Sequence, residues 1–333
     1  MMMSELIVLG IESTAHTFGV GIATSRGRIL ANVNEVYRPK AGGILPREAA
    51  EHHSRVAAKT VLKALETAGV TVRELDGIAV ALGPGMGPCL RVGATLARYI
   101  ALRYGKPLVP VNHAVAHVEI ARVSTGLEDP LVVYVAGGNT MIIAFKEGRY
   151  RVFGETLDIP LGNCLDVFAR EVGLGLPGTP KVEELGRRGR KFLEMPYVVK
   201  GQDLSFSGLL TYALNLWREG YRLEDVCYSL VETAYSMLTE VAERALVHVG
   251  KTELVLTGGV ARSRWLASKL MAMAKQHGAI FRVVPDEFAG DNGAMIALTG
   301  ALALSAGVKI NVEDSRIRPM WRLDEVDIPW RGR

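Results

Sequence analysis

Cysteine is scarce in this sequence. The 333 residues include only three, Cys89, Cys164 and Cys227, which lie far apart and form no CxxC pair. An odd number of widely spaced cysteines argues against a disulfide framework and against a cysteine-ligated zinc site. Each is expected to be a lone buried thiol.

Long hydrophobic runs are also missing. Hydrophobic residues make up 49% of the chain and charged residues 22%, yet no apolar stretch reaches the roughly 20 residues that a membrane-spanning helix needs. The opening stretch, MMMSELIVLGIESTAH, lacks the basic segment that begins a secretory signal peptide. The sequence therefore predicts a soluble, cytoplasmic protein with no membrane partner.

Charge of one sign is not in large excess. The net charge is +4, which by itself gives little support for a nucleic-acid partner. Positive charges are concentrated locally, in GRRGRK (186–191) and in a C-terminal set: Arg316, Arg318, Arg322, Arg331 and Arg333. A short basic run is often only a solvated helix face, so phosphate binding and simple solvation both stay open.

Strand and helix patterns alternate, and the same order occurs twice. Three β-rich segments fill about the first 36 residues, followed by a helix at 46–69, a strand at 75–83, a helix at 89–105 and the strand PLVPV. A hairpin and a third strand restart the order at LVVYVAGGN, and helices predominate from about 161 to 249. Two further strands and helices complete the second copy.

This alternation predicts an α/β protein with mixed sheets covered by helices. We expect two βββαβαβα lobes at 1–128 and 129–305, a helical insertion at about 161–222 in the second lobe, and a tail at 306–333. A cleft between two such lobes is a natural ligand site, because sites in α/β proteins lie outside strand ends.

Four polar or glycine-rich turns follow predicted strands: ESTAHT (12–17), GPGMGP (83–88), AGGNT (136–140) and TGGVA (257–261). Glycine lets a backbone approach a ligand closely, and exposed amides in such turns bind phosphate. None of them matches a P-loop, and no GxGxxG opens the first helix. The set favours a nucleotide site of the kind found in actin, sugar kinases and Hsp70.

The stretch VNHAVAHVEI (111–120) places His113 and His117 four residues apart. On a helix both imidazoles share one face, but a working metal site usually needs a further protein ligand. Ala114 stands where an HExxH zinc protease carries its general base, which argues against that class.

Two further residues are candidate ligands from the sequence alone. Asp291, at the start of the last strong helix, is more simply explained as an N-cap. Tyr134, at the end of a strand, is more simply explained as a half-buried strand tyrosine.

Taken together, the motifs resemble the universal tRNA N6-adenosine threonylcarbamoyltransferase family. The motifs occur in the order NHAVAHVE, YVAGGNT, LGNCLDVFAR, LPGTPKVE, LSFSGL, TGGVA and AGDNGAM, and GGILPREAAEHH and GPGMGPCLRVG extend them. The resemblance runs from Gly10 to about Trp330 and is strongest to the archaeal and eukaryotic branch, the catalytic subunit of the KEOPS complex. The family formerly carried the name O-sialoglycoprotein endopeptidase.

The resemblance implies an actin-like ATPase fold, of the ASKHA or ribonuclease H-like type, with one iron or zinc ion per subunit. The positions that match the metal ligands are His113, His117, Tyr134 and Asp291. The implied reaction transfers threonylcarbamoyl from threonylcarbamoyl-adenylate to N6 of the adenosine beside the anticodon, in tRNAs that read codons beginning with A. No general base is identified.

The resemblance also implies an adenylate or ATP-like nucleotide site. The matching positions are Tyr134, Val135, Ala136, Gly137, Gly138, Asp166, Thr179, Glu183 and Ser263. Asp166 and Glu183 would bind ribose hydroxyls. Thr179 replaces a family glycine and Ser263 a family asparagine, which puts nucleotide affinity in doubt more than the reaction class.

The implied partners are tRNA, threonylcarbamoyl-adenylate, and the kinase-like and small accessory subunits of a KEOPS-type complex. Two alternatives from other classes remain: a metalloprotease built on HxxxH and an actin-like small-molecule kinase. The missing Glu at position 114 argues against the first. A kinase gives the two histidines no role.

Overall fold

The structure is a computed structural model that describes residues 5–39 and 43–332. The chain forms two compact units from discontinuous segments. The first contains Met1–Ser124, Lys146–Tyr150 and Asp291–Arg333, and the second contains Thr125–Phe145 and Arg151–Gly290. Among the described residues, no helix combines the length and apolar character needed to cross a bilayer.

A five-stranded sheet organises the first unit, in the order β3-β2-β1-β4-β5. Its strands are β1 (Ile7–Glu12), β2 (Thr17–Thr24), β3 (Ile29–Val36), β4 (Gly77–Gly83) and β5 (Leu108–Asn112). The first three are antiparallel neighbours, and β4 and β5 run parallel to β1. Its helices are α1 (Pro46–Ala68), α2 (Gly87–Tyr104), α3 (His113–Thr125) and α10 (Gly293–Ser305).

The second unit repeats this sheet order as β12-β11-β6-β7-β8. Its strands are β6 (Leu131–Val135), β7 (Thr140–Lys146), β8 (Arg149–Glu155), β11 (Glu253–Thr257) and β12 (Ile280–Val283). Its helices are α4 (Leu161–Glu171), α5 (Gly178–Gly186), α6 (Ser207–Arg218), α7 (Leu223–Val249), α8 (Arg264–Gln276) and the short α9 (Asp286–Ala289). The repeated βββαβαβα order was therefore predicted correctly.

The insertion of the second unit contains one element that the sequence did not suggest. Between α5 and α6 a short hairpin forms from β9 (Val199–Lys200) and β10 (Asp203–Leu204). Asp158 holds the start of α6, because its carboxylate accepts the amide hydrogens of Phe206 (2.8 Å) and Ser207 (3.1 Å). Short polar segments of this kind carry little strand signal, since hydrophobic alternation needs more than two residues.

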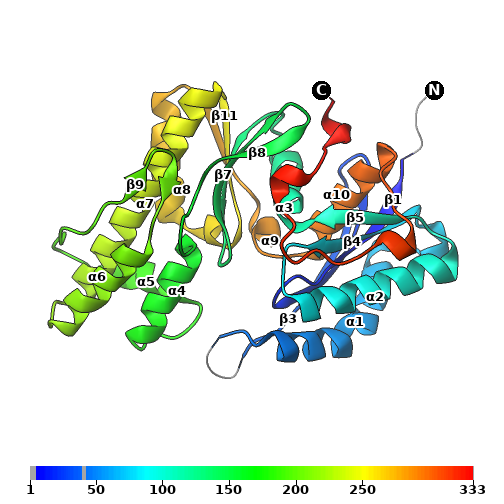
Figure 1. Ribbon diagram of the computed structural model, residues 1–333, viewed down its shortest axis with the longest axis horizontal. Helices are drawn as coiled ribbons and strands as arrows, with labels where there is room; N and C mark the ends of the chain where they lie inside the picture. The colour runs from blue at the N-terminus through cyan, green and yellow to red at the C-terminus, as the bar shows by residue number, and fades with distance from the viewer. Residues whose placement is uncertain (1–4, 40–42, 333) are drawn as a thin grey trace. The chain divides into compact units, whose positions relative to one another are not determined.

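Helix α10 packs on the first sheet, on the face opposite α1 and α2 (Figure 1). Alternate residues of a strand point to opposite faces, so Leu9 and Ile11 enter the core beneath α1 and α2 while Gly10 faces α10. A Cβ on Gly10 would lie 2.1 Å from the Ala297 nitrogen. The sheet thus admits the helix backbone at very short range.

Glycine therefore decides where the last helix lies. A Cβ on Gly21 of β2 would lie 2.4 Å from the Ala294 nitrogen, and one on Gly293 would lie 2.2 Å from the Gly21 nitrogen. The sequence predicts one lobe over 129–305, but in the structure α10 and the segment after it belong to the first unit. As a consequence, Asp291, two residues before α10, is delivered to the first sheet.

Gly21→Ala tests this close packing. The added methyl must displace the start of α10, and overpacking of this kind costs about 1–3 kcal/mol, so the midpoint of chemical denaturation should fall. Gly208→Ala is the matched control, because a Cβ there meets nothing within 4 Å. Equal midpoints for the two variants would contradict the proposed role of Gly21.

His53 of α1 provides a test of the first core at low pH. Its side chain is fully buried, its Nε2–H donates to the Ala15 carbonyl (3.0 Å), and burial lowers its pKa to about 4. The unfolded chain binds a proton near pH 6.5 and the folded chain does not, so stability should fall between about pH 6.5 and 4, by up to about 3 kcal/mol.

His53→Gln keeps an N–H donor but cannot titrate. We expect its free energy of unfolding to vary less over that pH range than that of the unsubstituted chain, whereas His248→Gln, at an exposed position, should leave the pH profile unchanged. Parallel pH profiles for His53→Gln and the unsubstituted chain would contradict this assignment.

Candidate functional site

Helix α3 begins where β5 ends and carries both histidines in its first turns. The His113 and His117 rings lie 4.8 Å apart between centroids, and both side chains are buried. Asn112 caps the helix, because its Oδ1 accepts the amide hydrogens of Ala114 (2.9 Å) and Val115 (3.2 Å). The pair is therefore fixed on one face of a capped helix, as its spacing predicted.

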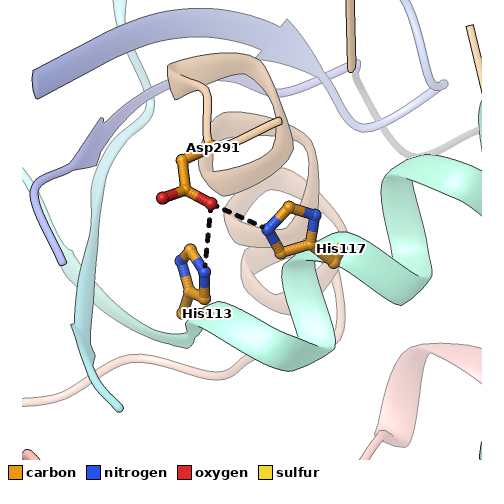
Figure 2. A group of neighbouring side chains, drawn as sticks. All are labelled: His113, His117 and Asp291. Atoms are coloured by element: carbon orange, nitrogen blue, oxygen red, sulfur yellow. Dashed lines mark hydrogen bonds and ion pairs between the residues drawn. The ribbon is translucent and has the colours of Figure 1, made fainter. Parts of the chain in front are cut away.

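Asp291 meets this pair from another part of the chain (Figure 2). One carboxylate oxygen, Oδ1, lies 3.5 Å from Nε2 of His113 and 3.2 Å from Nε2 of His117. The three potential ligand atoms all lie within 4.8 Å of one another. The N-cap of α10 is Asn292, whose side chain accepts the Met295 amide hydrogen (2.9 Å), so the simple N-cap explanation of Asp291 is wrong.

Glu12 orients the first histidine. Nδ1–H of His113 donates to Oε2 of Glu12 (2.9 Å), and the other carboxylate oxygen accepts the Thr14 amide hydrogen (2.6 Å). With Nδ1 engaged, Nε2 is the nitrogen that faces Asp291. Metal-binding histidines are commonly held in this way by a carboxylate on the opposite ring nitrogen.

The electrostatics of the group follow from burial and proximity. Burial lowers the pKa of His113, but the carboxyl groups of Glu12 and Asp291 outweigh it and raise this pKa to about 9. Burial alone would raise the pKa of Asp291, yet the neighbouring His113 and His117 hold it well below its usual range. For His117 burial is the larger effect and lowers the pKa.

The three side chains suit a metal ion. Two imidazole nitrogens and one carboxylate oxygen converge from two elements of the same unit, and this donor set fits zinc as well as iron. An ion bound here would displace the proton from Nε2 of His113, as metal binding to histidine generally does. The group therefore offers three ligand atoms to one cation.

Tyr134 belongs to a different unit of the chain. It ends β6 in the second unit, is fully buried, and its hydroxyl oxygen accepts a hydrogen bond from the Asn139 amide (3.4 Å). Its part as a further metal ligand remains a prediction.

The glycine-rich turns differ in why they need glycine. Gly258 of TGGVA has φ +95°, and a Cβ there would lie 2.3 Å from the Val135 oxygen. A Cβ on Gly83 of GPGMGP would similarly lie 1.9 Å from the Arg318 oxygen. In AGGNT, by contrast, a Cβ on Gly137 or Gly138 meets nothing within 4 Å. Packing explains the first two glycines, whereas the last two border open space.

The other predicted nucleotide positions lie in the second unit. Val135 ends β6 and is buried, and Ala136 follows it with its amide hydrogen donated to the Asn139 oxygen (2.8 Å). Thr179 is in the first turn of α5. Asp166 of α4 accepts the amide hydrogen of Gly178, the first residue of α5 (2.7 Å).

Two of these positions meet around Tyr235 of α7. Glu183 is buried and accepts a hydrogen bond from the Tyr235 hydroxyl. The Ser263 hydroxyl accepts the Leu266 amide hydrogen (3.0 Å) and so caps α8. Serine and asparagine are about equally favoured at an N-cap, so the departure from the family asparagine preserves the cap of α8.

Sequence reasoning missed Glu12 and Asn112 as parts of the site. A signal for each was present, because Glu12 ends a buried apolar strand and Asn112 stands directly before a helix, where asparagine is a favoured cap. Neither signal names a partner, since His113 is 101 residues from Glu12.

Comparison with known proteins identifies the family. A sequence model described as TsaD, tRNA N6-adenosine threonylcarbamoyltransferase, matches residues 28–298. The chain is 72% identical over 332 residues to the protein of that name from Thermofilum pendens, covering 99% of both chains. A second relative of the same name, from Caldivirga maquilingensis, is 59% identical and covers 98% of each.

The chain belongs to the tRNA N6-adenosine threonylcarbamoyltransferase family.

Solved structures support the fold expected for this family. HypF from T. kodakarensis superposes with a TM-score of 0.63 at 18% identity, covering 90% of this chain and 48% of that one. Component A of the (R)-2-hydroxyglutaryl-CoA dehydratase of Acidaminococcus fermentans gives 0.55 at 14% identity, covering 90% and 99%. At these identities the likeness concerns fold alone, and it confirms the predicted actin-like ATPase fold.

Glu12→Gln tests how the family's two histidines are held in this chain. The substitution keeps the side-chain shape but replaces one acceptor oxygen with an NH2 group, so either His113 or Thr14 loses its partner. We expect affinity for Zn²⁺ or Co²⁺, measured by chelator competition, to fall about 10- to 100-fold. Glu5→Gln, which removes an ion pair with Arg28 in the same unit, should bind metal normally, and an equal loss in both variants would contradict the role of Glu12.

Proposed function

We propose that this chain transfers the threonylcarbamoyl group of threonylcarbamoyl-adenylate to N6 of the adenosine beside the anticodon in tRNAs that read codons beginning with A. The observation that carries the proposal is the convergence of His113, His117 and Asp291 within 4.8 Å, in a chain whose relatives bear the name of that enzyme over nearly their whole length. The name of those relatives specifies transfer to tRNA.

The proposed metal ligands are His113, His117, Asp291 and Tyr134, and the ion is iron or zinc. When bound, the metal would polarise and orient the carbamoyl group as a Lewis acid. Glu12 would keep Nε2 of His113 directed at the ion, because its carboxylate holds the opposite ring nitrogen. Asn112 would fix the first turn of α3 through two amide hydrogen bonds.

The proposed adenylate site comprises the turn from Tyr134 to Gly138 together with Asp166, Thr179, Glu183 and Ser263. Open space at Gly137 and Gly138 supports close approach of a ligand to their backbone. Backbone amides there would stabilise negative charge as it develops on the carbamoyl oxygen and the leaving phosphate. Asp166 and Glu183 would accept hydrogen bonds from the ribose.

In this reaction the exocyclic amine of adenosine attacks the carbamoyl carbon, the bond to the phosphate oxygen breaks, and AMP leaves. The amine loses one proton in the process. Unpaired loop bases suit such a transfer, because they can be turned into a pocket without opening a duplex. We further propose that the chain works with the kinase-like and small accessory subunits of a KEOPS-type complex.

The protease alternative is weakened by Glu12. Ala114, at the position of the HExxH base, is buried, and the acidic side chain nearest to His113 already accepts hydrogen bonds from that ring and from Thr14. A water-activating base would need a carboxylate free to take a proton.

A transfer assay tests the proposal directly. The chain is incubated with unmodified tRNA, threonine, bicarbonate, ATP and the adenylate-forming synthase, with and without the accessory subunits, and the digested tRNA is analysed by mass spectrometry. We expect N6-threonylcarbamoyladenosine in the complete mixture, and its absence there would refute the proposal. His113→Ala and His117→Ala should each lose bound metal and product, and full metal occupancy in both would remove the pair from the site.

A further inference from the structure

The basic run at 186–191 divides into two kinds of residue in the structure. Nη2 of Arg188 pairs with Oε1 of Glu184 at 2.9 Å. Arg187, at the C-cap of α5, instead lines a cavity of about 390 Å³ in the second unit. A solvated, ion-paired helix face therefore accounts for Arg188 but leaves Arg187 unexplained.

Three elements form this cavity. The end of α5 contributes Gly186 and Arg187, α7 contributes Tyr228, and α8 contributes Arg264, Trp265 and Ser268. No local pattern indicates this grouping, because the contributing segments are separated by about 40 residues each.

Aromatic rings make up much of the wall. Tyr228 and Trp265 are stacked, with 5.8 Å between ring centroids and 27° between planes, and Phe192 meets Tyr228 edge-on at 6.2 Å. Phe192 is 51% exposed. The Trp265 ring is held in place by its Nε1–H, which donates to Glu232 (3.0 Å). These contacts form a preordered aromatic row that ends at the surface.

Positive charge accompanies the row. Among residues 5–39 and 43–332, neither Arg187 nor Arg264 has a carboxylate within ion-pair distance, and both are exposed. In the C-terminal set, by contrast, Arg318 pairs with Glu325 and Arg322 with Asp324. Arg333 lies outside the described residues. Two unneutralised guanidinium groups stand beside the half-buried Tyr228 and Trp265 rings and the exposed Phe192 ring. This combination matches a ligand that carries both a planar ring and a negative charge.

We propose that this cavity binds one nucleotide of single-stranded RNA, with the base against the Tyr228–Trp265 row and the phosphodiester between Arg187 and Arg264. Proteins hold single strands in this way, through aromatic stacking beside a cationic track. The inference rests on the proposed function and deepens it, because it assigns a place where the tRNA is held outside the reacting centre.

A nucleotide could also come from the adenylate donor, but the residues argue for RNA. None of Asp166, Thr179, Glu183 and Ser263 lines the cavity. Glu183 bonds to Tyr235, which is seven residues from Tyr228 on α7. That is about 10 Å along a helix. Glu183 is only three residues before Gly186, and Ser263 directly precedes Arg264, so the cavity adjoins the proposed donor contacts but shares no lining residue with them.

The test measures binding of the full chain to labelled unmodified tRNA at several salt concentrations, with AMP binding measured in parallel. Arg187→Gln/Arg264→Gln should weaken tRNA binding and reduce the slope of log K against log salt by about 0.7, because the two arginines flank a single phosphodiester and each phosphate neutralised on a single strand contributes about that much. Trp265→Leu should weaken binding about fivefold or more with its slope unchanged, and Trp265→Phe should retain most of the affinity. Arg188→Gln is the matched control and should bind normally.

Several outcomes would overturn the inference. Binding by the double variant and by Trp265→Leu that equals the unsubstituted chain at every salt concentration would exclude an RNA contact. Loss of AMP binding with tRNA binding intact would assign the cavity to the donor. Loss of association with an accessory subunit alone would make it a protein interface. Failure of the transfer assay in the unsubstituted chain would instead refute the proposed function, and salt-dependent tRNA binding through this cavity would still be measurable.

Discussion

Close packing between glycine backbones is the constraint on which the candidate metal centre depends. Gly10 and Gly21 carry no side chain where the first sheet faces α10, and Gly293 carries none at the start of that helix. Helix and sheet therefore approach nearly backbone to backbone at these positions. Asp291 directly precedes this contact and is carried with it to the histidines of α3. A side chain at any of these glycines would collide with the backbone of the facing element.

Neighbouring residues divide the work at this junction. Asn292 caps α10, which frees Asp291 to direct its carboxylate at the histidines. Asn112 caps α3 in the same way, so the side chain of His113 in the first turn is not needed as a cap. The Asn112 amide also donates to the Trp321 carbonyl (3.1 Å), which ties the C-terminal segment to the same helix. Structural capping and ligand presentation thus use adjacent but separate side chains at both elements.

Glycines serve different purposes at different positions. Gly10, Gly21 and Gly83 of the first unit and Gly258 of the second admit neighbouring backbone, and substitution there would cause a collision. Gly137 and Gly138 of the second unit border open space, so their lack of a side chain serves no packing need. Neither a positive φ nor a blocked Cβ position accounts for glycine at these two places, so their backbone is left accessible.

The sequence alone determined the alternating βββαβαβα order, the helix that places His113 and His117 on one face, and, through its motifs, the family. These features are local or carried by residue order, so periodicity and spacing reveal them. The tertiary structure decided that α10 packs on the first sheet, that Asp291 rather than Asn292 faces the histidines, and that Glu12 orients His113. It also decided that Arg188 is ion-paired whereas Arg187 lines a cavity. Each of these depends on contacts between segments far apart in the chain, which no local pattern records.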